Sequence, residues 1–142
     1  MWLDPRLESD SSFVIDLELC HVRLSHNAAF PWIFLIPHQA SIFEIIDLSP
    51  SDQKQLMQEI CLASVLMKSL FQPTKLNVAS LGNIVSQLHI HIVARYKNDK
   101  AWPGPIWNSG INTMYPPKEK TERISRIKEA FWELVPSSSD NV

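Results

Sequence analysis

The chain has 142 residues, of which 45% are apolar, and its formal net charge at pH 7 is −2. This length fits one compact domain with a sizeable core, and the small charge excludes the positive field of a typical nucleic-acid or acidic-membrane binder. No secretory signal pattern and no apolar run of roughly 18 residues, enough to span a bilayer, is visible. Cys20 and Cys61 read as buried thiols of a reducing compartment. We therefore expect a cytoplasmic protein.

The first elements in chain order are two strands. Residues 20–26 alternate between apolar and polar side chains, which predicts a strand, and residues 27–29 form a turn. Residues 32–36 are continuously apolar, as in a strand that is covered on both faces.

A long helix follows these strands. Ser49, Pro50 and Asp52 are typical of a helix start, with a capping hydroxyl, a proline in the first turn and an acid at the third position. Apolar residues then recur at helical spacing as far as Leu70, and Pro73 ends the helix.

The rest of the chain supplies two further strands and a second helix. Residues 76–79 and 88–94 are the predicted strands, and residues 119–134 carry a helical apolar stripe. The polar residues 136–142 are expected to be a disordered tail. Hairpin-connected strands with one long helix predict an α+β fold and not a doubly wound one.

The strand at residues 88–94 carries the most informative pattern. Its apolar residues fall on one face and can bury in a core, whereas Gln87, His89 and His91 fall on the other. Neighbouring side chains of this row lie about 6.5–7 Å apart. A neutral imidazole in such a row can attack a phosphorus ester, and a flanking imidazolium can bind the phosphate oxygens and protonate a leaving group.

Two other interpretations of this row stay open. It can be a solvated polar face, since histidine is intermediate in burial preference, although Gly82 and Asn83 just before it are typical of a turn whose backbone N–H groups approach an anion. It can also be a metal site with His89 and His91 as ligands, although Arg95 stands on the same face where a carboxylate would be needed and suits an anionic ligand better.

The row and the residues before it resemble the active-site motif of the histidine triad (HIT) superfamily, His-φ-His-φ-His-φ-φ, where φ is apolar. Gln87 stands in the place of the first histidine. The resemblance extends upstream to the strand of Asn77, the Gly82 turn and the step at Pro37 before the long helix, and it covers residues 20–95.

The resemblance implies a single HIT-like domain at residues 1–135, in which an antiparallel sheet packs with one long helix and a C-terminal helix. It also implies a symmetric homodimer, and the apolar stripe at residues 56–70 exceeds what one small sheet needs to cover. The partners implied are a purine nucleotide or a related small phosphate compound, with no nucleic acid and no membrane.

The implied activity is hydrolysis or nucleotidyl transfer at the α-phosphate of a nucleoside phosphate, dinucleoside polyphosphate or phosphoramidate, through a nucleotidyl-histidine intermediate and without a cofactor or metal. His89 matches the nucleophilic histidine, and His91 matches the histidine that holds phosphate and leaving group. The expected substrate-binding residues are Asn27, Asn77, Gly82, Asn83 and Trp107.

Trp107 enters that set because of its loop. Trp102 and Trp107 lie in a Pro-rich segment that is similar to segments of some bacterial HIT branches. Two exposed tryptophans are costly, so they either fold back on the core, seal a dimer contact, or form an aromatic wall beside the histidine row.

Gln87 is the departure that bears on activity. Its amide can donate a hydrogen bond to a phosphate oxygen but cannot shuttle a proton. We expect an active hydrolase in which Gln87→His would complete the triad. The alternatives are a nucleotide-binding or regulatory module of low activity and, less favoured, a metal-dependent enzyme that uses His89 and His91 as ligands.

Overall fold

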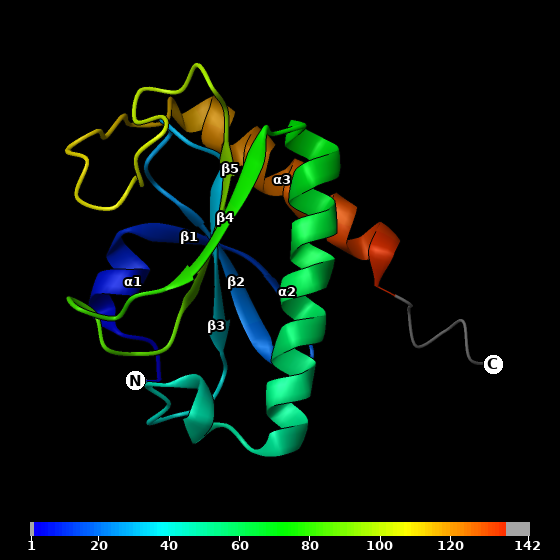
Figure 1. Cartoon of the computed structure of the whole chain (residues 1–142). Coiled ribbons are helices and arrows are strands. Elements are labelled where there is room, and N and C mark those ends of the chain that lie inside the picture. Colours follow the sequence, from blue (N-terminus) through cyan, green and yellow to red (C-terminus); the bar gives the residue numbers. More distant parts are fainter. Residues whose placement is uncertain (1, 136–142) are drawn as a thin grey trace.

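The computed structural model describes residues 2–135, so the tail expected at residues 136–142 lies outside the described residues. Figure 1 shows a sheet with two long helices on one side and a short helix on the other. In chain order the elements are α1 (Pro5–Ser9), β1 (Ser11–Asp16), β2 (Cys20–Ser25), β3 (Trp32–Pro37), η1 (Ile45–Asp47), α2 (Pro50–Phe71), β4 (Lys75–Ser80), β5 (Ile90–Arg95) and α3 (Pro117–Leu134).

The sheet has the strand order β1-β2-β3-β5-β4, and every pairing is antiparallel. Hairpins join β1 to β2 and β2 to β3, while the chain between β3 and β4 runs through α2 before β5 returns between them. This architecture confirms the α+β prediction. It also places β5, the strand of the histidine row, inside the sheet, where both of its edges are paired.

Helix α2 begins and ends where its sequence predicts. The Ser49 hydroxyl accepts a hydrogen bond from the Asp52 backbone N–H, and Pro50 occupies the first turn. The helix closes at Gln72, whose backbone takes the left-handed conformation at φ 47°. Its buried face includes Leu56 and Ala63, which pack against the sheet together with α3.

The two faces of the sheet bury different cores. The face toward α2 and α3 holds the main core, and the apolar side chains of the histidine strand lie in it as predicted. The opposite face is covered by α1 with the residues before it and by the loop at residues 101–111. Strand β3 is therefore buried on both faces, which confirms the expectation from its continuous apolar run.

Three elements of the structure have no counterpart among the predicted elements, and one cysteine lies at the surface. Helix α1 has five residues and η1 has three, and the register of β1 shifts between Phe13 and Ile15. None of these elements therefore shows a regular spacing of apolar residues in the sequence. Cys61 is exposed on α2, which corrects the prediction that both cysteines are buried. Among the described residues, no helix is long and apolar enough to cross a membrane.

Candidate functional site

The two histidines of the row lie side by side on the face of the sheet away from α2. His89 precedes β5, His91 belongs to it, and their ring centroids are 4.7 Å apart. Phe34 of β3 is paired with His91 and packs edge-on against both rings. Both histidines are nearly buried, with 7% and 5% of their surfaces exposed. The pair is therefore a built cluster and not a solvated polar face.

The tautomer of His89 is set by the backbone of Gln87. The Nδ1 atom of His89 lies 2.7 Å from the Gln87 carbonyl oxygen. A carbonyl can only accept a hydrogen bond, so Nδ1 carries the proton and donates it. The lone pair of the ring is thus on Nε2, which is the arrangement a nucleophilic imidazole needs.

The tautomer of His91 is set in the opposite sense by Trp32. The indole Nε1 of Trp32 donates to Nδ1 of His91 over 3.1 Å. An indole N–H is only a donor, so Nδ1 of His91 holds a lone pair and its proton is on Nε2. The pair therefore presents one nitrogen lone pair, on His89, beside one N–H donor, on His91.

Burial keeps both rings neutral. Desolvation lowers the pKa of His89, although the hydrogen bond to the Gln87 carbonyl and the charge of Asp4 act in the raising direction. Desolvation, and then the charge that His89 would carry, lower the pKa of His91 to about 3. The flanking imidazolium expected from the sequence is therefore a neutral imidazole, which still donates through its Nε2–H.

The free nitrogens of the pair reach solvent, whereas one neighbouring donor does not. Among the described residues, the only buried side-chain nitrogen or oxygen without a hydrogen-bond partner is Nε1 of Trp107. Its ring lies 5.3 Å from that of His91, centroid to centroid. The Trp107 ring also packs on the core of Phe30, Val93 and Ile106, so it both folds back on the core and lies beside the pair, and its role toward a ligand stays a prediction.

Two of the predicted binding residues, Asn27 and Asn77, have hydrogen-bond partners within the protein, and a third shapes a turn. The Asn27 amide donates to the Ile111 carbonyl and accepts from two backbone N–H groups, so it ties down a loop. The side-chain oxygen of Asn77 accepts a hydrogen bond from the Arg95 guanidinium, so this residue also has a partner inside the protein. Gly82 turns the chain before the row at φ +76°, a left-handed conformation that favours glycine.

Asn83 is exposed on that turn, and its ligand role stays a prediction. Arg95 corrects the sequence interpretation. It is 1% exposed and forms an ion pair with Asp99 at 2.8 Å, and it also donates to the Gly104 carbonyl. Its guanidinium therefore fixes the loop that carries the two tryptophans and is not free to meet an anion.

Gln87 also has partners that the sequence did not reveal. Its side-chain oxygen accepts from the backbone N–H of Asp4 over 2.7 Å, and its NH₂ group donates to the Trp2 carbonyl over 2.8 Å. The amide is therefore engaged at both ends with the first residues of the chain. The predicted contact with a phosphate oxygen would have to compete with these bonds.

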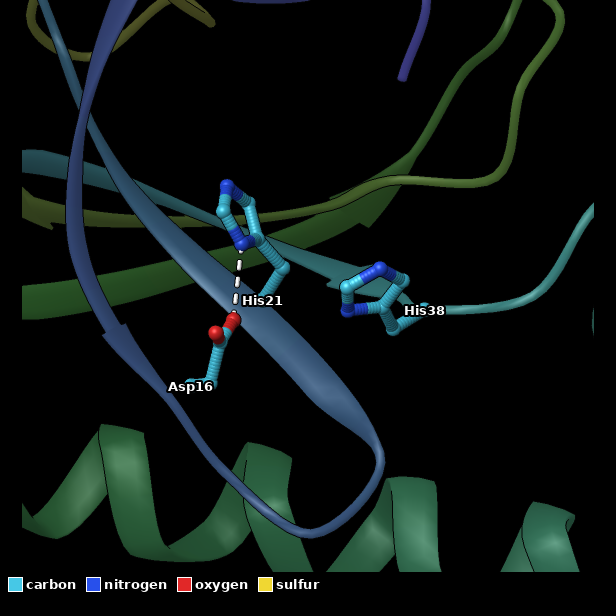
Figure 2. Close-up of side chains that lie close together, drawn as sticks. All are labelled: Asp16, His21 and His38. Atoms are coloured by element: carbon cyan, nitrogen blue, oxygen red, sulfur yellow. Dashed lines mark hydrogen bonds and ion pairs between the residues drawn. The ribbon is translucent and has the colours of Figure 1, made fainter. Parts of the chain in front are cut away.

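A second histidine cluster lies on the same face near the other end of the sheet. Asp16, His21 and His38 place their potential ligand atoms within 4.8 Å of one another, and Figure 2 shows His21 pointing toward the Asp16 carboxylate. His21 Nδ1 is 2.7 Å from that carboxylate, and its Nε2 lies 3.1 Å from the Arg23 guanidinium.

These bonds leave no lone pair on His21 for a metal. Arg23 can only donate, so Nε2 of His21 is the acceptor and Nδ1 carries the proton that Asp16 accepts. A metal on Nδ1 would move the proton to Nε2, against a guanidinium that is 7% exposed and held by Ser11. This is also the only group of three potential ligands among the described residues, and it contains neither His89 nor His91.

Two residues of the site had no local sequence signal. Trp32 lies in a continuously apolar run, which gives it no mark of a functional role, and Asp4 lies far from the motif in sequence. The register that pairs Phe34 with His91 also brings the Trp32 side chain to the same face. Only a prediction of that strand pairing could have found it.

Comparisons with known proteins agree with this geometry. The profile of the HIT domain family matches residues 6–98. No curated protein matches the sequence. A histidine triad protein from Bradyrhizobium japonicum is 39% identical, with a TM-score of 0.89 over 92% of this chain and 97% of its own.

Two further solved structures are similar over nearly their whole length. A histidine triad protein from Sinorhizobium meliloti is 40% identical, with a TM-score of 0.87 over 90% of this chain and 95% of its own. One from Marinobacter aquaeolei is 34% identical, with a TM-score of 0.89 over 94% of this chain and 97% of its own.

Proposed function

The chain belongs to the histidine triad (HIT) family, and on this premise we propose that it hydrolyses or transfers nucleotidyl groups, with His89 as the nucleophile. The substrate class is a nucleoside phosphate, dinucleoside polyphosphate or phosphoramidate that reacts at its α-phosphate. The observation that carries the proposal is the complementary pair of tautomers, a lone pair on His89 Nε2 beside an N–H on His91 Nε2.

The chemistry runs as two displacements at phosphorus. In the first, Nε2 of His89 forms a bond to the α-phosphorus, and the bond to the leaving group breaks with its electron pair. In the second, a water oxygen forms a bond to phosphorus, the bond to Nε2 breaks, and the nitrogen regains its lone pair. The released water proton passes to solvent, and this balances the proton that an amine leaving group takes from solvent in the first step.

The surroundings of the pair support this sequence of steps. The Nε2–H of His91 can donate to a non-bridging phosphate oxygen in both steps, because Trp32 keeps the proton on that nitrogen. The turn at Gly82 is the proposed source of further donors, through its backbone N–H groups. The Trp107 ring also offers an aromatic surface to a nucleobase.

Trapping of the intermediate tests the proposal. Purified protein is mixed with an adenosine monophosphate ester that has a good leaving group, quenched within one turnover, and analysed by intact-mass and peptide spectrometry. We expect an adenylyl group on His89 and no adduct in His89→Asn. His26→Gln is the matched control, because His26 bonds Ser12 at the far side of the sheet. An adduct on any other residue would refute the assignment.

The second candidate is a nucleotide-binding module of low activity, and the observation that favours it is Gln87 in place of a histidine. Thermal-shift measurements with AMP and GMP separate the two. Stabilisation by nucleotide without any trapped adduct supports the module. Tight binding of about one equivalent of zinc that is lost in His91→Asn would instead support the metal-dependent alternative, for which the described residues supply no third ligand beside the pair.

The proposed assembly is a homodimer. Met57 and Val65 expose more than half of their surfaces on α2, and Val78 is 47% exposed on the edge strand β4. Exposed apolar side chains on a helix and on an edge strand are the kind of feature that a second copy covers. Light scattering at micromolar concentration tests this, and a mass near the 16.3 kDa of one chain would contradict it.

A further inference from the structure

The segment before β1 lies across the sheet face that carries His89 and His91. Leu3 and Leu7 are buried, with 6% and 4% of their surfaces exposed, and they pack against Phe34 and Ile36 of β3. Trp2 stacks on His38 with 3.8 Å between ring centroids. Figure 1 shows this short helix on the side of the sheet opposite α2. The segment therefore packs on the same sheet face as the histidine pair and forms one side of the site.

Gln87 holds this segment by an unusual use of its side chain. The amide donates to the carbonyl before Leu3 and accepts from the N–H after it. A strand residue in a parallel sheet bonds its neighbour in this same way, through the flanking carbonyl and N–H groups. The side chain thus stands in for a peptide group, and both backbone groups that flank the buried Leu3 are satisfied.

The same residue also orients the nucleophile. The backbone carbonyl of Gln87 accepts the proton of His89 Nδ1, while its side chain holds Asp4. Asp4 forms an ion pair with Arg6, whose guanidinium also donates to the Ile84 carbonyl in the turn before the row. The N-terminal segment is therefore joined to residues 84–87 at two points, by the Gln87 side chain and by the bond from Arg6 to the Ile84 carbonyl.

We propose that Gln87 is a positioning residue that docks the segment Trp2–Arg6 onto the histidine row and so fixes the position of Asp4 relative to His89, which bonds the Gln87 carbonyl, and that its amide does not bind the phosphate. A histidine cannot replace it, because the donor and acceptor of a neutral imidazole point away from each other and cannot meet a carbonyl and an N–H of one extended segment. The role in catalysis rests on the proposed function; the docking does not.

Amide hydrogen exchange tests the docking without any substrate. The Asp4 N–H bonds only the Gln87 side chain, so Gln87→Met should speed its exchange by about tenfold, the effect of losing one hydrogen bond. Gln53→Met is the matched control, since the Gln53 amide bonds the Leu48 carbonyl beside α2. Unchanged exchange of the Asp4 amide in Gln87→Met would overturn the proposal.

A double-mutant cycle on the pKa of His89 tests the positioning. The Asp4 charge acts to raise the pKa of His89, so Asp4→Asn should lower it, as followed by the NMR titration of the His89 ring. In the Gln87→Met background the two amide bonds that hold Asp4 and Trp2 are missing, and Asp4→Asn should then change the pKa less. Equal changes in both backgrounds would mean that Gln87 does not place Asp4.

The activity of Gln87→His separates this proposal from the proposed function. We expect single-turnover transfer no faster than in the wild type, with the same rapid Asp4 exchange as in Gln87→Met. Faster transfer in Gln87→His would overturn the positioning role and mark Gln87 as a replaced triad histidine. Changes in exchange and pKa without trapped adduct in any variant would uphold the docking and refute only the nucleotidyl chemistry.

Discussion

The sheet face away from α2 carries two histidine clusters that differ in how many ring nitrogens remain free. His89 and His91 each have one nitrogen fixed by a protein partner and one that is open to solvent. His21 has both nitrogens engaged, by Asp16 and by Arg23. The clusters share a face, similar aromatic neighbours and lowered pKa values at these three rings.

The comparison shows that histidine proximity alone does not make a reactive site. Three potential ligands lie close together around His21, yet the hydrogen bonds use every lone pair of that ring. In the other cluster, a carbonyl and an indole N–H fix the protons so that one lone pair and one N–H remain. The hydrogen-bond partner of one ring nitrogen therefore decides whether the other nitrogen carries a lone pair or a proton.

The largest expected effect is the loss of nucleotidyl transfer in His89→Asn. Without the Nε2 lone pair no covalent intermediate forms, so the single-turnover rate should fall by far more than tenfold, which is about 1.4 kcal/mol of barrier. His21→Asn should keep transfer near the wild-type rate. Rapid-quench measurements on both variants test this difference. A single-turnover rate above one-tenth of the wild-type rate in His89→Asn would show that His89 is not the nucleophile.

The two clusters should also differ in acid stability. A histidine whose folded pKa lies below its unfolded value near 6.5 contributes stability that is complete above that value and is lost as the pH falls toward the folded pKa. For His91 the window extends from about 6.5 down to about 3. Burial also lowers the pKa of His21, but the Asp16 carboxylate opposes the shift.

We therefore expect the urea-unfolding free energy of the wild type to fall by roughly 1–3 kcal/mol between pH 7 and pH 4. His91→Asn should flatten this dependence more than His21→Asn does. The comparison is between slopes, so any general destabilisation by a substitution cancels. A steeper acid loss in His91→Asn than in the wild type would show that the folded ring is protonated more readily than the free one.

Trp32→Phe should have a smaller, more specific effect. It removes the N–H that keeps the proton of His91 on Nε2, while the ring and its packing against Phe34 largely remain. We expect a mixture of His91 tautomers in ¹⁵N NMR spectra and about tenfold slower transfer, the worth of one hydrogen bond. Trp132→Phe is the control, because Trp132 is 61% exposed on α3, on the face of the sheet away from the pair. A single unchanged tautomer in Trp32→Phe would remove the indole from the mechanism.

The sequence predicted the histidine row and helix α2 because both depend on local signals. A two-residue period fixes which side chains of β5 face the core, and Ser49 with Pro50 fixes the helix start. The α+β class followed from the order of these elements. The resemblance to the HIT family supplied the role of His89, which periodicity alone cannot give.

The hydrogen-bond partners of the site residues could not be predicted from the sequence, because these partners lie far away along the chain. Gln87 meets residues 83 and 85 positions away, and Trp32 is 59 positions from His91. Arg95 looked like an anion site because its strand face is visible in sequence, but the loop that supplies Asp99 and Gly104 to it is not. The spacing of apolar residues predicts which face of a strand a side chain lies on, but not which distant residues pack on that face.

Asp16→Asn should have the smallest effect on stability, and it tests directly whether the His21 cluster binds a metal. The Asp16 side chain is 55% exposed, so losing its pair with His21 should change the unfolding free energy by no more than about 0.5 kcal/mol. The pKa of His21 should fall further, because the carboxylate that raises it is gone. If the cluster instead held a metal, added Zn²⁺ would raise the melting temperature of the wild type and Asp16→Asn would abolish that gain. We expect no such gain, because Arg23 holds His21 in the tautomer that has its proton where the metal would bind.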